Sequence, residues 1–126
     1  MQLTANFTLA EFKCKDGCGV PDPLLDNVRE LAANLQVLRD QIGKPIKIMS
    51  GYRTPEYNAK CGGETKSQHM EAKAADIIVT GMAPTEVCNA IKLLIGAGKM
   101  KQGGVGLYDG WVHYDVRGTR ARWGGA

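Results

Sequence analysis

The strongest constraint on the fold is a run of apolar residues that recur three and four positions apart. That spacing places them on one face of a helix. The residues are Leu24, Val28, Leu31, Leu35, Leu38 and Ile42. Pro23 stands where such a helix begins, and Gly43 stands where it ends. We therefore expect one long helix that packs this face against a core and takes no direct part in function.

The remaining segments predict a small sheet. Four short apolar or alternating segments predict strands, at residues 46–50, 74–79, 104–107 and 111–116. Asp109 and Gly110 join the last two as a hairpin. Residues 84–96 predict a second helix, whereas residues 56–66 predict a loop with perhaps one helical turn. We expect one α+β domain over residues 1–126, with helices on one side of a mainly antiparallel sheet.

Composition excludes several classes of protein. The chain has 126 residues, 44% hydrophobic and 23% charged, as in one globular domain. No apolar run is long enough to span a bilayer, and the first residues lack the features of a secretory signal. The net charge is only +3, and most basic residues are scattered along the chain. We therefore expect no nucleic-acid partner. Beyond the helix faces expected to pack in the core, the sequence shows no large apolar surface for a second copy of the chain. We therefore expect a monomer.

Asp76 lies in unusual surroundings, inside the apolar segment 74–79. A carboxylate there loses hydration worth several kcal/mol unless a cation or hydrogen-bond donors compensate for it. The two histidines of the chain, His69 and His113, lie seven positions before it and 37 positions after it. Two imidazoles and one carboxylate are a common ligand set for catalytic zinc. The three residues are therefore candidate zinc ligands.

Alternation along the last predicted strand decides which side chains share a face. Trp111, His113 and Asp115 lie on one face, and we expect the opposite face to pack on the helices. His113 and Asp115 then lie in an open cleft. Tyr108 and Trp111 fit two roles equally well, as packing aromatics or as walls of that cleft.

Three segments resemble motifs of the M15 zinc peptidases, the family of D-alanyl-D-alanine carboxypeptidases and peptidoglycan endopeptidases. Residues 67–76 are similar to its S-x-H-x6-D signature, and residues 50–55 (SGYRTP) resemble its S-G-Y-R segment. Residues 104–115 resemble the closing strand of its short phage-type and cell-wall members. The resemblance runs in order from about Phe7 to Trp123 and implies a hedgehog/D-Ala-D-Ala peptidase-like fold.

The resemblance also implies roles for single residues. The implied zinc ligands are His69, Asp76 and His113. Arg53 matches the family arginine that holds the substrate peptide or stabilises the developing oxyanion, although a loop arginine can equally pair with a surface carboxylate. Tyr52 and Ser67 match positions near the substrate. The implied chemistry is metal-assisted amide hydrolysis, in which a carboxylate moves a proton from water to the leaving amine.

The sequence departs from the family pattern at the general base. Many M15 enzymes carry Glu or Asp three residues before the last zinc histidine, where this chain has Gly110. The nearest carboxylates are those of Asp109 and Asp115. Alternation favours Asp115 as the general base, because it shares a face with His113; alternatively it orients that histidine.

We therefore expect a zinc-dependent peptidase that cuts D,D- or L,D-bonds in peptide stems or cross-links of bacterial peptidoglycan. Since no signal peptide or wall-binding domain is recognisable, we expect a phage or prophage lytic enzyme. Such an endolysin or virion component is made in the bacterial cytoplasm and reaches the wall after release. Because Gly110 stands where many M15 enzymes carry the general base, a second interpretation remains. In it, the chain is a catalytically silent zinc module that binds the wall.

The cysteines are Cys14, Cys18, Cys61 and Cys88, and we expect them to be reduced, buried thiols. The spacing of Cys14 and Cys18 matches half of a structural zinc site, but no second pair of ligands follows it. A structural zinc at these two residues is the weaker alternative.

Overall fold

The long helix predicted from the apolar spacing is present in the computed structural model, which describes residues 1–126. Its regular part, α1, spans Leu25–Ile42 and follows a short 3-10 turn, η2, at Asp22–Leu24. Pro23 therefore lies in that turn and not at the first residue of α1. Gly43 ends the helix in the left-handed conformation, with φ of 66°.

Five strands form one sheet in the order β1-β2-β4-β3-β5. They are β1 (Ile46–Ser50), β2 (Ala74–Val79), β3 (Gly104–Leu107), β4 (Val112–Asp115) and β5 (Ala121–Trp123). The first four are confirmed, with β4 one residue shorter than predicted at each end. β5 was not predicted, and it pairs in parallel with β3 while the other three pairs are antiparallel. The predicted α+β fold with a mainly antiparallel sheet is confirmed.

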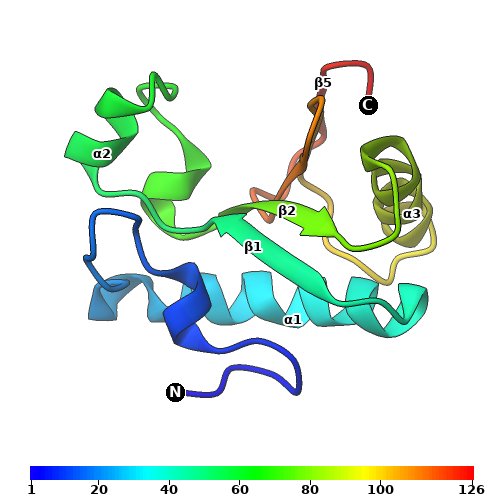
Figure 1. Ribbon diagram of the computed structural model, residues 1–126, viewed down its shortest axis with the longest axis horizontal. Coiled ribbons are helices and arrows are strands. Elements are labelled where there is room, and N and C mark those ends of the chain that lie inside the picture. The colour runs from blue at the N-terminus through cyan, green and yellow to red at the C-terminus, as the bar shows by residue number, and fades with distance from the viewer.

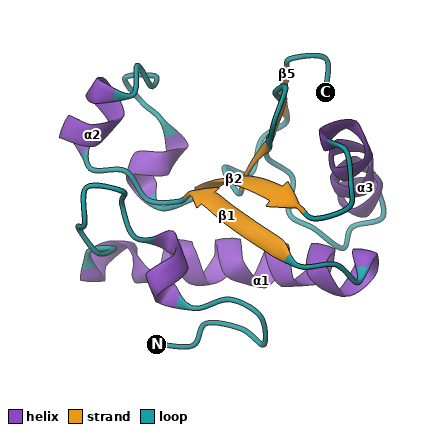
Figure 2. Ribbon diagram, viewed as in Figure 1, coloured by secondary structure: helices purple, strands orange, loops and turns teal.

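The other helices differ in how well the sequence predicted them. α3 spans Pro84–Gly96 with its proline in the first turn, as predicted. α2 spans Pro55–Lys60. Thr54 caps its N-terminus, because the Thr54 hydroxyl accepts a hydrogen bond from the Tyr57 N–H. Two further 3-10 turns, η1 (Leu9–Phe12) and η3 (Gln68–Glu71), were not predicted (Figure 2). None of the helices combines the length and apolar character needed to cross a membrane.

The two faces of the sheet have different surroundings. Ile77 of β2 and Val112 and Tyr114 of β4 belong to one hydrophobic core that also contains the apolar face of α1 and residues of α3. In Figure 1, α1 runs beneath β1 and β2, and α2 and α3 lie toward opposite ends of the molecule. The alternate residues, Asp76 and His113, point to the face that the two long helices leave free.

Strand register aligns one row of residues across that free face. The row contains Ser50, Asp76, His113, Gly106 and Trp123, each the register neighbour of the next. A bulge in β1 between Ile48 and Ser50 brings Ser50 into this row. The sheet thus brings residues from five separate segments side by side.

Candidate metal centre

The three predicted ligands meet at the free face. Asp76 Oδ1 lies 3.4 Å from His69 Nε2 and 3.3 Å from His113 Nδ1. All three side chains are buried, and their potential ligand atoms lie within 4.8 Å of one another. No other group of three His, Cys, Asp or Glu side chains in the chain has this geometry.

His69 is held by backbone groups. It lies in η3, where Ser67 Oγ accepts a hydrogen bond from the His69 N–H at 3.2 Å. Its Nδ1 lies 2.7 Å from the Gly51 carbonyl oxygen, which can only accept, so Nδ1 carries the proton. Gly51 permits this close packing, because a Cβ there would lie 2.8 Å from the Phe12 Cα and carbonyl oxygen. His69 therefore turns a bare Nε2 toward Asp76.

His113 is held by a buried carboxylate. Its Nε2 donates to Asp115 Oδ2 at 2.7 Å. The two Asp115 oxygens also accept from the Gly104 N–H at 2.8 Å and from Arg117 Nε and Nη2 at 2.9 and 2.8 Å. Asp115 is fully buried, and a side chain at Gly104 would collide with its carboxylate. His113 therefore turns a bare Nδ1 toward Asp76.

The resulting arrangement lacks a positive group at its centre. Two unprotonated nitrogens lie 3.3 and 3.4 Å from one carboxylate oxygen, and all three atoms are acceptors. Two ligands each about 2.1 Å from a tetrahedral zinc ion lie about 3.4 Å apart. The donor set and the spacing of these three residues therefore fit a zinc ion.

Arg53 neutralises the outer oxygen of the same carboxylate. Its Nη2 donates to Asp76 Oδ2 at 3.3 Å, and its Nε donates to Ser50 Oγ at 3.3 Å. Its Nη1 donates at 3.4 Å to Oδ1 of Asn58, a residue only 3% exposed. With 16% of its side chain exposed, Arg53 is a part of the site and not a solvated loop residue.

The environment keeps both carboxylates charged. Burial alone would raise the pKa of Asp76, but the influence of the adjoining His113 and His69 rings outweighs it and holds the pKa well below its usual range. The pKa of Asp115 is lowered in the same way, by His113, Arg117 and the Gly104 N–H. Burial would lower the pKa of His113, yet its hydrogen bonds with Asp115 and Asp76 raise the pKa overall. The two carboxylates therefore favour a proton on His113.

Three other predicted site residues have roles in holding the structure together. Both oxygens of Asp115 are occupied, which matches the orienting role; its role as general base stays a prediction. Tyr52 lies in the hydrophobic core with 7% of its surface exposed, so packing accounts for its position and substrate binding stays a prediction. Ser67 caps η3, and substrate contact by its hydroxyl is likewise a prediction.

Sequence reasoning missed several residues that complete the site. Ser50 and Asn58 orient Arg53, and Arg117 holds Asp115. The Trp123 ring lies 4.9 Å from the His113 ring, with the Arg117 guanidinium 5.6 Å above the indole. A strand glycine often marks the close approach of another group, and Gly106 in β3 was such a signal, because a side chain there would collide with Trp123.

The prediction of buried thiols is wrong for two of the four cysteines. Cys14 and Cys88 are buried, but Cys18 and Cys61 are exposed, because both lie in surface loops outside the helices and strands. All four are free thiols. Cys14 and Cys18 belong to no group of three potential ligands, so the structure gives the alternative zinc site no further ligand.

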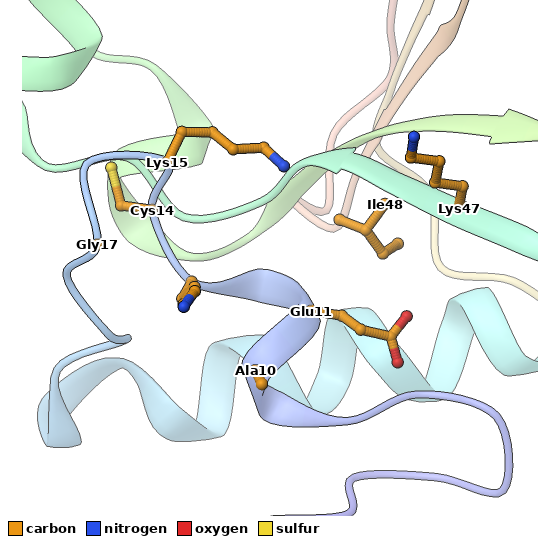
Figure 3. A pocket seen from close by; sticks show the side chains of 8 residues that line it. Ala10, Glu11, Cys14, Lys15, Gly17, Lys47 and Ile48 are labelled. Atoms are coloured by element: carbon orange, nitrogen blue, oxygen red, sulfur yellow. The ribbon is translucent and has the colours of Figure 1, made fainter.

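A cavity of about 380 Å³ lies elsewhere, between η1 and β1, and contains none of the predicted site residues. Figure 3 shows Lys15, Lys47 and Cys14 around it. The polar groups of the metal centre therefore identify the candidate site better than cavity volume does.

Comparison with known families agrees with this geometry. The Peptidase M15 family model matches residues 3–115, which include His69, Asp76 and His113. This chain belongs to the Peptidase M15 family. M15 peptidases are zinc enzymes, and the group formed by the three residues is the place where this metallopeptidase can bind its ion. Arg117 and Trp123 lie beyond the matched residues. No curated protein matches the chain.

Proposed function

We propose that this M15 peptidase hydrolyses peptide bonds in the stems or cross-links of bacterial peptidoglycan. The observation that carries the proposal is the pair of bare histidine nitrogens turned toward Asp76 on a sheet face that the long helices leave free. The S-G-Y-R, S-x-H-x6-D and closing-strand motifs support peptidoglycan as the substrate, since they resemble those of wall-cleaving members.

In the proposed reaction, different residues of the chain have different roles. A zinc ion held by His69, Asp76 and His113 supplies a Lewis acid that polarises a carbonyl and lowers the pKa of a water. Arg53 binds Asp76 through Nη2, and its remaining N–H groups are donors for the substrate carbonyl or carboxylate. Burial of the site keeps these interactions strong by excluding bulk water.

In this proposal Asp115 orients His113, and a different group moves the proton. Asp109, exposed on the turn between β3 and β4, is the second carboxylate close to His113 in the sequence. The two roles separate experimentally. If Asp115 orients His113, Asp115→Asn weakens zinc binding. If it is the general base, the variant binds zinc normally and loses the acidic limb of the pH profile of kcat/KM.

A second candidate function is a zinc-containing module that binds the wall without cutting it. The observation that favours it is the missing carboxylate at Gly110, together with the fully occupied oxygens of Asp115. Under this proposal the zinc-loaded protein binds wall fragments and turns over none of them.

The deciding experiment is mass spectrometry of products from defined muropeptides incubated with the zinc-loaded protein. We expect new amino termini that reveal the cleaved bond, and their loss with a chelator or with His113→Ala. Leu93→Ala is the matched control, because Leu93 is 74% exposed on α3 and far in sequence from the metal ligands. Cleavage that persists in the chelator would contradict the metallopeptidase mechanism, and absence of any cleavage would favour the binding module.

We further propose a role in phage or prophage lysis, as an endolysin or a virion component that reaches the wall after release from the cytoplasm. The resemblance of residues 104–115 to the closing strand of short phage-type members supports this role. Wall lysis after expression together with a membrane-permeabilising protein, and none without it, is the expected result.

A further inference from the structure

The free face of the sheet carries a second feature next to the metal centre, a pair of stacked aromatic rings. The rings of Tyr108 and Trp111 lie 4.7 Å apart with 10° between their planes. The Tyr108 N–H donates to the Trp111 carbonyl at 3.1 Å, so the strand ends hold the pair together. Alternation places Trp111 on the same face as His113, two residues along the chain. We call Tyr108 and Trp111 the aromatic shelf.

Direct contacts connect the shelf to a metal ligand. The Tyr108 hydroxyl accepts a hydrogen bond from Trp123 Nε1 at 2.9 Å. The Trp123 ring in turn lies 4.9 Å from the ring of His113. Gly106 leaves the space that the indole fills. A substrate bound at His113 therefore has the shelf as an adjoining surface.

The shelf is open to solvent. Tyr108 is 39% exposed and is one of three large hydrophobic residues in the chain that are exposed, together with Met1 at the terminus and Leu93 on α3. Tyr108 stacks on Trp111 and bonds to Trp123, yet it keeps more than a third of its surface free for contact beside the metal centre. Its position indicates a ligand contact.

The shape of the shelf selects the kind of ligand. The two near-parallel rings form a flat aromatic surface, and a flat surface suits a ring laid against it. A sugar ring presents C–H groups on its face, which pack on an aromatic ring, and hydroxyl groups at its edge. Because the Tyr108 hydroxyl accepts from Trp123, its own proton is left to donate to such a group.

We propose that the aromatic shelf binds a sugar ring of the glycan chain to which the scissile peptide is attached. The proposal rests on peptidoglycan being the substrate and makes it more specific: the preferred substrate is a peptide still joined to its amino sugar.

The experiment compares kcat/KM for a disaccharide-bearing muropeptide with kcat/KM for the same peptide without sugars. The wild type should prefer the sugar-bearing substrate by about 3- to 10-fold, the range expected for one aromatic stacking contact. Tyr108→Ala should bring the ratio close to one. Tyr108→Phe, which keeps the ring face, and Leu93→Ala, an exposed site on α3, should retain a preference. Tyr108 is the position to vary because it is exposed, whereas Trp111 borders the core.

A ratio of one in the wild type, or an unchanged ratio in Tyr108→Ala, would overturn the proposal. A second measurement separates this failure from failure of the proposed function. The metal-free protein is titrated with the disaccharide alone while tryptophan fluorescence is recorded. If neither peptide substrate is cleaved, the peptidoglycan peptidase assignment fails, and the titration alone judges the shelf: saturable binding that Tyr108→Ala abolishes supports it, and no binding overturns it.

Discussion

The two histidines at the candidate metal centre of this M15 peptidase are held by different kinds of structure. His69 lies in a short 3-10 turn and donates to a neutral backbone carbonyl. His113 lies on a central strand and donates to the buried carboxylate of Asp115, which Arg117 grips with two nitrogens. One support is local and uncharged, and the other is a charged network across the sheet.

This difference has energetic consequences. A carboxylate that accepts from a ligating histidine raises the basicity of the ring and fixes its orientation more strongly than a carbonyl does. Breaking a buried charged network leaves a charge without a partner, whereas weakening the 3-10 turn removes only a neutral hydrogen bond. We therefore expect changes on the His113 side to cost more than changes on the His69 side.

The largest effect is expected for Asp115→Asn. It leaves Arg117 without its buried partner and should lower the free energy of unfolding by about 3 kcal/mol. Zinc affinity should fall by about 10- to 100-fold, because a neutral amide replaces the carboxylate that orients His113 and raises its basicity. Denaturant unfolding and competition with a chelator measure the two quantities. Asp109→Asn, exposed on the nearby turn, is the control and should change stability by no more than about 0.5 kcal/mol. Equal zinc affinity in both variants would contradict the comparison.

A smaller loss is expected for Gly51→Ala on the His69 side. The added Cβ would lie 2.8 Å from the Phe12 backbone, so the loop that offers its carbonyl to His69 must move. We expect a stability loss of about 1–3 kcal/mol, as for other overpacked sites. Gly110→Ala is the matched control, since a Cβ at Gly110 would meet nothing within 4 Å. An unchanged melting temperature in Gly51→Ala would show that close packing of Gly51 on the Phe12 backbone is not needed for stability.

The pH dependence of the metal-free protein should reveal the charged network directly. The folded pKa of His113 lies above its ordinary 6.5, so its contribution to stability is complete below that pH and is lost as pH rises through the folded pKa. The folded pKa values of Asp76 and Asp115 lie below 3.8, so their contribution is present above 3.8 and is lost as pH falls through the folded values. Metal-free stability should therefore peak between these two limits.

Denaturant unfolding at about pH 5 and about pH 9 tests this dependence. The metal-free protein should be less stable at the higher pH, and added zinc should stabilise it more there, because zinc competes with the proton for His113. A metal-free protein that gains stability between these two values would contradict the account.

The smallest effect is expected for Ser67→Ala, which removes the hydroxyl that accepts from the His69 N–H. Loss of such a cap costs about 1 kcal/mol, and zinc affinity should change little, since the Gly51 carbonyl still holds the ring. If Ser67 also touches the substrate, KM should rise more than the stability loss explains. A zinc affinity as low as that of Asp115→Asn would refute the ranking of the two supports.

The sequence predicted what depends on short-range pattern. The apolar spacing of α1, the strand around Asp76 and the alternation that puts His113 on the free face all follow from local periodicity. The carboxylate in an apolar segment and the only two histidines suggested the three candidate ligands, and the family motifs supported them across long sequence separations.

What the sequence could not predict depends on pairing between distant segments. β5 is only three residues long and gains its place by parallel pairing with β3, so no periodicity marks it. Alternation placed Asp115 in an open cleft beside His113. Its burial could not be predicted, because it depends on contacts with Arg117 and the Gly104 N–H. Tyr52 was expected at the substrate and lies in the core, since the backbone turns there to pair with Phe12.

X-ray absorption at the zinc edge of the loaded protein tests the central claim most directly. With one zinc per chain, we predict nitrogen and oxygen ligands alone, about 2.0–2.1 Å from the metal, and loss of this spectrum in His113→Ala. Sulfur ligands at about 2.3 Å would instead assign the ion to the cysteines and contradict a site built from His69, Asp76 and His113.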